Sequence, residues 1–102
     1  MSISIAYKKA GKGKPIFFIH GIGSRKESWE KITAKLKNNF LCITYDLRGH
    51  GESKIDETNF NINDLVQDLE NLRIFLKINK MHIVGHSLGG MIGPCYAKKY
   101  KN

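Results

Sequence analysis

The feature that most constrains the fold of this chain is the stretch of residues 81–93, MHIVGHSLGGMIG. Its first four residues, Met81 to Val84, predict a short buried strand. A turn of small residues follows, with Ser87 between Gly85 and Gly89, and apolar residues at helical spacing come next. A strand, the pattern G-x-S-x-G and a helix in this order are typical of a nucleophile elbow, a tight turn that strains its central residue. Because the two glycines leave room around that residue, we expect the hydroxyl of Ser87 to stand clear of the strand.

The predicted helix begins at Ser87, so its free amide hydrogens and the positive end of its dipole point toward the same place. Negative charge that develops on a substrate oxygen would be stabilised there. The other interpretation is an ordinary strand-to-helix turn with an incidental serine. The pentapeptide alone leaves both interpretations open, and the flanking strand and helix favour the first.

Further strands are predicted upstream of this turn. Residues 2–8 alternate between polar and apolar, as in a half-exposed strand, whereas 16–19 and 40–45 are apolar runs typical of strands covered on both faces. With helices between them, these strands predict an α/β fold with a mostly parallel sheet. Active groups collect at the carboxyl ends of the strands in such sheets. The residues predicted at these ends are His20, Gly21, Asp46 and Ser87.

Apolar residues spaced three and four apart predict three helices. Ser24 or Ser28 is the candidate cap of the first helix, and Asn61 or Asn63 that of the second. Pro94 falls inside the third, where it either kinks the helix or is absorbed by local packing. The predicted apolar faces are Trp29, Ile32 and Leu36 in the first helix, Ile62, Leu65, Val66, Leu69, Leu72, Phe75 and Leu76 in the second, and Leu88, Met91, Ile92, Cys95 and Tyr96 in the third.

The composition of the chain argues against several classes of binding partner and of cellular location. The chain has 102 residues, enough for one domain, and a net charge of +8 from 17 basic and 9 acidic residues. The basic residues are dispersed and never exceed two in a row, which argues against nucleic-acid binding. No apolar run is long enough to span a membrane or to act as a signal peptide. Cys42 and Cys95 are both predicted to be buried, without a disulfide framework or metal-type spacing, which favours a cytoplasmic protein.

Three motifs in order resemble those of the α/β-hydrolase superfamily, in particular the branch of enol-lactonases, cofactor-free haloperoxidases and small carboxylesterases. The resemblance covers essentially the whole chain and implies a three-layer sandwich around a mostly parallel sheet. The motifs are His20-Gly21-x-Gly23, Asp46-x-Arg48-Gly49-His50-Gly51-x-Ser53 and Gly85-His86-Ser87-x-Gly89-Gly90.

The resemblance implies roles for individual residues. Ser87 matches the nucleophile, and the backbone amides of Ile22 and Leu88 match the oxyanion hole. The positions of His20, Gly21, Gly85, His86 and Gly89 match residues that shape the site, and none of the histidines, His50 included, matches the general base. Asp46 and Arg48 match residues that fix their loop through hydrogen bonds. The expected substrate is a small ester, lactone or thioester, and no metal or organic cofactor is implied.

The chain departs from the family pattern after Ser87. In this fold the catalytic acid and histidine follow the serine along the chain. Residues 88–102 contain no Asp, Glu or His. The sequence therefore predicts that residues 1–102 are the N-terminal part of one hydrolase domain, truncated after the helix that follows the elbow and without the cap region.

Truncation at this point predicts an exposed apolar sheet edge, marginal stability and self-association through that edge. It also leaves open a second function, that of a short non-catalytic α/β protein that binds another protein through the edge.

Overall fold

The computed structural model describes residues 5–21, 23–48, 50–51, 53 and 61–100. These residues form a four-stranded sheet with the strand order β1-β3-β2-β4. Strand β1 runs antiparallel to β3, whereas β2 is parallel to both β3 and β4, so the predicted mostly parallel sheet is confirmed. The elements in chain order are β1 (Tyr7–Ala10), β2 (Lys14–Ile19), the 3₁₀ helix η1 (Lys26–Trp29), α1 (Glu30–Leu36), β3 (Phe40–Tyr45), α2 (Ile62–Phe75), β4 (His82–Gly85) and α3 (Leu88–Lys99).

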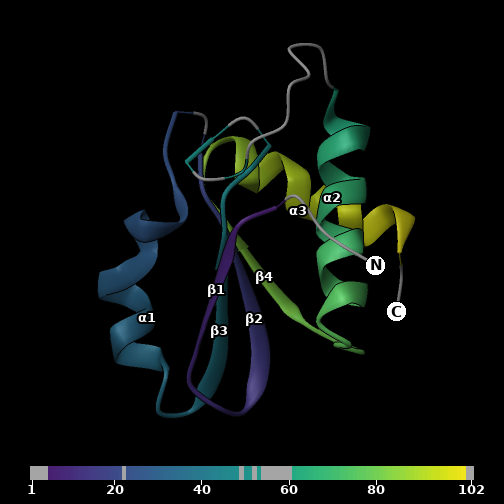
Figure 1. Cartoon of the computed structure of the whole chain (residues 1–102). Coiled ribbons are helices and arrows are strands. Elements are labelled where there is room, and N and C mark those ends of the chain that lie inside the picture. The colour runs from purple at the N-terminus through teal and green to yellow at the C-terminus, as the bar shows by residue number, and fades with distance from the viewer. Residues whose placement is uncertain (1–4, 22, 49, 52, 54–60, 101–102) are drawn as a thin grey trace.

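Helices cover both faces of the sheet, as the predicted three-layer arrangement requires. Helix α1 lies on one face and helices α2 and α3 lie on the other (Figure 1). On the α1 face, Phe18 packs against Trp29 with ring centroids 5.2 Å apart. The larger core lies under α2 and α3, and its fully buried members include Phe17, Ile19, Ile43, Tyr45, Leu69, Leu72 and Ile92.

The parallel register brings the carboxyl ends of three strands together. Ile19 at the end of β2 pairs with Tyr45 of β3 on one side and with Gly85 of β4 on the other. The segments that follow β2, β3 and β4 therefore leave the sheet at one edge, which is where residues 20, 46 and 87 were expected to meet.

The predicted strands differ from the observed ones at their ends. Strand β1 begins at Tyr7 and continues to Ala10, whereas residues 2–4 of the predicted strand lie outside the described residues. Strand β2 begins at Lys14, two residues before its apolar run, while β3 matches the predicted range of 40–45.

The cap predicted for the first helix is wrong. Neither Ser24 nor Ser28 caps it, and Arg25 precedes η1 without a side-chain capping bond. The backbone N–H of Lys26 instead donates to the carboxylate of Asp46, 2.6 Å away at the tip of β3. A residue 20 positions along the chain thus does what a local cap was expected to do. For the second helix, Asn61 is the cap, in a reciprocal capping box with Asp64.

Two predicted apolar faces are only partly buried. In α1, Ile32 is 45% exposed because the tighter 3₁₀ turn before it changes the phase, so that Thr33 follows Trp29 into the interior. In α3, Ile92 and Tyr96 are buried, but Met91 is 60% exposed and Cys95 is exposed. The prediction that both cysteines are buried holds for Cys42 alone.

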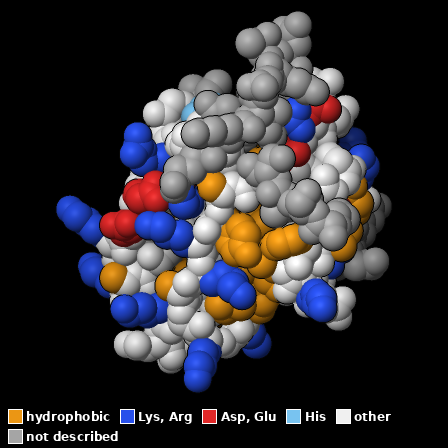
Figure 2. Space-filling view, in the orientation of Figure 1, with side chains coloured by type: hydrophobic (Ala, Val, Ile, Leu, Met, Phe, Trp, Pro, Cys, Tyr) orange, Lys and Arg blue, Asp and Glu red, His pale blue; other side chains and the backbone are white. Residues whose placement is uncertain are grey.

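Strand β4 is an edge strand and not the buried strand that its sequence alone suggests. Within the described residues it pairs with β2 only, and Val84 is 40% exposed. The exposed strand edge that the sequence predicts is therefore present among the described residues. The lysine and arginine side chains are dispersed over the face shown in Figure 2. No helix in the described ranges has the length and apolar character that a membrane span requires.

Candidate active site

The backbone of Ser87 takes the strained conformation expected for the centre of the turn. Its φ of 56° and ψ of −115° lie outside the regions that residues with a side chain ordinarily adopt. Such a conformation costs on the order of 1–3 kcal/mol and persists only where its surroundings enforce it. The amides of Gly89 and Gly90 close the turn on the carbonyls of His86 and Ser87, at 3.0 and 2.9 Å.

Close backbone contacts explain the glycines around Ser87. A Cβ atom at Gly85 would overlap the carbonyl of Gly89, and one at Gly89 would overlap the carbonyl of Ile19. The amide of His86 also donates to the Ile19 carbonyl, over 3.1 Å. Strand β4, the turn and the first residues of α3 are thus packed backbone to backbone against the end of β2.

The segment after β2 passes directly beside Ser87. A Cβ atom at Gly21 would lie 3.1 Å from Cβ of Ser87 and 3.4 Å from the carbonyl oxygen of His86. Leu88, whose amide is an expected oxyanion donor, is the first residue of α3, where an N–H has no intrahelical acceptor. The second expected donor, Ile22, lies outside the described residues.

The hydrogen bonds of His20 give its side chain a structural task. Its Nε2 accepts from the amide of Leu47 at 3.0 Å, so Nδ1 carries the proton and donates to the Gly21 carbonyl at 2.7 Å. Burial, with a smaller effect from the charge of His50, lowers the pKa of His20 despite the bond to Gly21. A neutral ring with both nitrogens engaged is a poor candidate for a general base at Ser87.

Asp46 and Arg48 both hold the loop that follows β3, in keeping with the expectation for their positions. The Asp46 carboxylate is fully buried and binds both the backbone N–H and the ammonium group of Lys26. Arg48 forms a bidentate pair with Asp68 of α2, with N–O distances of 2.8 and 2.9 Å. The burial of Lys26 could not be predicted from the residues around it, because a lysine that follows a glycine-rich loop is usually solvated.

No hydrogen bond joins the expected nucleophile, Ser87, to a basic side chain among the described residues. Ser87 is exposed, and no hydrogen bond of its hydroxyl to another described residue is present. A cavity of about 300 Å³ lies beside it, bounded by His20, Gly21, Trp29 and His86 among others. His86 is exposed next to Ser87, and no hydrogen bond or ion pair joins its ring to a carboxylate among the described residues. No cluster of described side chains has the composition of a metal site.

Comparison with known proteins agrees with this arrangement. A sequence model described as the alpha/beta hydrolase fold matches residues 14–102. The chain is 35% identical to 2-(acetamidomethylene)succinate hydrolase from Mesorhizobium japonicum over 96% of its own length and 35% of the relative's. It is 31% identical to 3-oxoadipate enol-lactonase 1 from Acinetobacter baylyi, over 88% of this chain and 34% of the enzyme.

Solved structures give the same result. A thermophilic esterase from Thermogutta terrifontis superimposes with a TM-score of 0.90 and 30% identity, over 95% of this chain and 36% of the esterase. The chain spans between 28% and 36% of the length of the first curated relatives that it matches. The match of the family model over 14–102, the strained serine turn and the mostly parallel sheet together show that the chain belongs to the α/β-hydrolase fold family.

Proposed function

We propose that this chain carries the nucleophile-bearing part of a serine hydrolase that cleaves a carboxylic ester, lactone or thioester. The observation that carries the proposal is the conformation of Ser87, with its positive φ at the turn between β4 and α3. A strained residue is maintained where the surrounding packing determines it, and such positions gather at active sites. The esterase and enol-lactonase among the relatives support the choice of substrate class.

The proposed reaction is acyl transfer through an ester of Ser87. The hydroxyl oxygen attacks the carbonyl carbon while a general base takes its proton, and the carbonyl oxygen becomes an oxyanion. The amides of Leu88 and Ile22 are the proposed donors to that oxyanion. The leaving alcohol or thiol departs with the proton, and water then attacks the acyl group, which releases the acid and restores the serine.

The general base and the acid that orients it are proposed to come from polypeptide other than residues 1–102. None of residues 88–102 is Asp, Glu or His, and the family order places both groups after the serine. Without a base the hydroxyl is a weak nucleophile. We therefore expect residues 1–102 alone to be inactive or weakly active.

A second function is supported by the exposed edge of β4. Among the described residues, β4 pairs with β2 on one side only, and a free strand edge with exposed Val84 is a template for adding a strand from another protein. In that case the chain would be a non-catalytic binding module, and the serine would have no chemical task.

Labelling with a fluorophosphonate separates these functions, because the probe reacts with activated serines. We expect a labelled band in native cell lysate that disappears in Ser87→Ala and persists in Cys95→Ala, which removes an exposed thiol away from the site. A band well above 11.6 kDa would show that the base belongs to a longer form of this polypeptide, whereas a band at 11.6 kDa would show that a partner supplies it. Absence of any band that depends on Ser87 would contradict the hydrolase and favour the binding module.

A further inference from the structure

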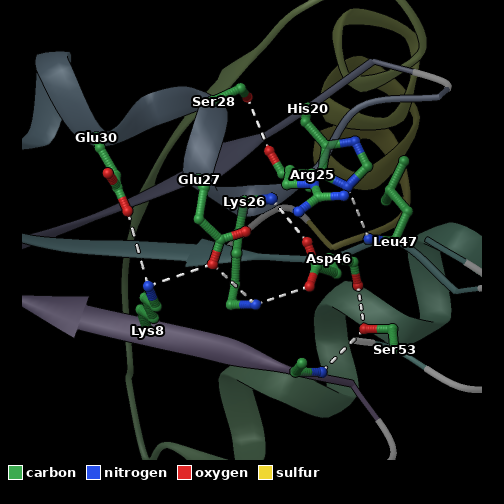
Figure 3. Close-up of polar contacts among 11 residues, drawn as sticks. Lys8, His20, Arg25, Lys26, Glu27, Ser28, Glu30, Asp46, Leu47 and Ser53 are labelled. Carbon is green, nitrogen blue, oxygen red and sulfur yellow. Dashed lines mark hydrogen bonds and ion pairs between the residues drawn. The ribbon is translucent and has the colours of Figure 1, made fainter. Parts of the chain in front are cut away.

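Two consecutive residues at the tip of β3 hold both ends of the segment that passes Ser87. The segment, residues 20–26, connects β2 to η1. At its start, His20 accepts a hydrogen bond from the amide of Leu47 at 3.0 Å. At its end, the amide of Lys26 donates to Asp46 Oδ1 at 2.6 Å, and Lys26 Nζ donates to Oδ2 at 2.8 Å. Figure 3 shows the carboxylate of Asp46 between these two ends of the segment.

The pair of Asp46 and Lys26 is almost completely removed from water. Their side chains are 0% and 2% exposed, and the carboxylate of Glu27 lies 3.2 Å from the same ammonium group on its outer side. Removing two charges from water offsets most of what their attraction contributes, so a buried ion pair is weak evidence for a stabilising role. Unlike an apolar side chain, the carboxylate accepts hydrogen bonds from the main-chain amide and the ammonium group of Lys26 at once. These two bonds together specify one position of Lys26.

Asp46 is itself fixed by its own loop. A Cβ atom at Gly51 would overlap the Asp46 carboxylate, so the loop closes directly over it. The hydroxyl of Ser53 donates to the backbone carbonyl of Asp46 at 2.6 Å and accepts from the amide of Ala6 at 2.9 Å (Figure 3). The group that holds Lys26 therefore has little freedom of its own.

We propose that Asp46, acting through Lys26, is a positioning residue that sets the distance between the main chain at Gly21 and Ser87. The catalytic part of this inference rests on the proposed hydrolase function. A Cβ atom added at Gly21 would lie only 3.1 Å from Ser87 Cβ, so the main chain at Gly21 already lies close against Ser87 and the segment has little room to move toward it. A displacement of about 1 Å in such a site can lower a rate by about 100-fold.

The first test measures the position of the segment without any need for catalysis. Asp68 provides the matched control, since it is only 8% exposed and pairs with Arg48 of the same loop, but it lies on α2 and not on that loop. In Asp46→Asn we expect amide hydrogen exchange at Ser24 and Lys26 to accelerate by at least about tenfold beyond any global change, one tenfold step being 1.4 kcal/mol. In Asp68→Asn the exchange at these two amides should follow global stability alone.

A second variant guards against misfolding. Asp46→Ala combined with Lys26→Met removes both charges of this buried pair and so leaves neither of them unpaired, and it is expected to fold even if Asp46→Asn does not. The amide at position 26 loses its acceptor in this variant and should exchange faster in the same way. Unchanged exchange at Ser24 and at position 26 in the variant that folds would overturn the proposal.

The second test measures the consequence at Ser87. In the polypeptide that shows labelling dependent on Ser87, we expect Asp46→Asn to lower the second-order rate of fluorophosphonate labelling by at least about tenfold, and Asp68→Asn by less than about threefold. Equal slowing in both variants would overturn the proposal, because it would reflect stability alone. If the unsubstituted protein is not labelled at all, the proposed function fails, and the exchange measurement still decides whether Asp46 positions the segment.

Discussion

At the scale of single residues, the turn around Ser87 requires neighbours without a Cβ atom, because backbone atoms occupy the space that a side chain would need. Gly89 lies against the carbonyl and Cβ of Ile19, whereas the nearest atom to a Cβ at Gly90 would be the Gly85 oxygen, 3.9 Å away. Two adjacent glycines near the start of the same helix therefore have opposite environments. One is required by packing, and the other only adds conformational freedom to the unfolded chain.

This contrast gives a prediction for two alanine variants. Gly89→Ala forces α3 away from β2 and should lower the free energy of unfolding by about 1–3 kcal/mol. Gly90→Ala meets no obstacle and should raise it by about 0.5–1 kcal/mol, because alanine favours the helix. Urea unfolding monitored by circular dichroism checks both values. A destabilising Gly90→Ala would show that the turn is more crowded than the structure indicates.

His20 leads to a prediction about pH. Its pKa is lowered in the folded state, chiefly by burial, so below the unfolded pKa of about 6.5 the unfolded chain binds a proton that the folded chain resists. Stability is therefore expected to be complete above about pH 6.5 and to fall as the pH decreases toward 5, with a slope of at most about 1.4 kcal/mol per pH unit.

The matched variants for this prediction are His20→Gln and His82→Gln. His82 is exposed on β4, so His82→Gln serves as the control for the loss of a surface histidine. Replacement of His20 should remove the slope, although the variant will be less stable at every pH because the ring fills buried space. Chemical denaturation at a series of pH values measures how the free energy of unfolding changes with pH. An unchanged slope in His20→Gln would show that a group other than His20 causes the loss of stability at low pH.

At the scale of secondary-structure elements, the two helix starts illustrate different origins of order. Helix α2 is capped by Asn61 and Asp64, which exchange hydrogen bonds of 3.1 and 3.0 Å within one turn. The 3₁₀ helix η1 is instead capped from the tip of β3 by Asp46. A local cap is visible in the sequence, whereas a cap supplied by another strand exists only once the sheet has formed.

The cap of α2 can be tested against the neighbouring asparagine, which the sequence left as the alternative. Asn61→Ala should lower the free energy of unfolding by about 1 kcal/mol, because the amide of Asp64 loses its acceptor on the Asn61 side chain. Asn63→Ala should change it by less than about 0.5 kcal/mol, since Asn63 is an exposed residue inside the helix. Equal effects in thermal or urea unfolding would contradict the assignment of the cap.

At the scale of the whole molecule, the two edges of the sheet differ in the side chains that they expose. The β1 edge carries Lys8 and Lys9, both exposed, and charged side chains oppose pairing with another strand. The β4 edge carries His82 and the 40%-exposed Val84. A cavity of about 530 Å³ lies beside it, lined by residues of β4 and by small residues of α3. We therefore expect residues 1–102 to associate through β4.

Sedimentation velocity over a range of concentrations tests this expectation. Val84→Lys should shift the chain toward monomer, because a charge on the edge strand opposes the addition of a second strand. Ile74→Lys, which replaces an apolar residue that is 50% exposed on α2, should leave the association unchanged. A monomer with a sharp unfolding transition independent of concentration would contradict both the association and the expected marginal stability.

Much of the fold and of the candidate site was predictable because the deciding interactions are local. Alternation and apolar runs give strand β3 with its correct bounds, and the spacing of Leu65, Leu69 and Leu72 gives helix α2 with its correct buried face. The strained turn at Ser87 follows from the steric demands of neighbouring residues, which the glycines at 85 and 89 reveal.

Features that depend on which elements become neighbours could not be predicted from the sequence and are visible only in the folded protein. The burial of Lys26 and the capping of η1 come from Asp46, 20 residues away, and could not be read from the residues around η1. The exposure of Met91 and Cys95 likewise depends on what covers α3, and not on their apolar character. The sequence by itself determines backbone conformations that are set within one turn or strand, whereas the sheet order determines which side chains lose their contact with water.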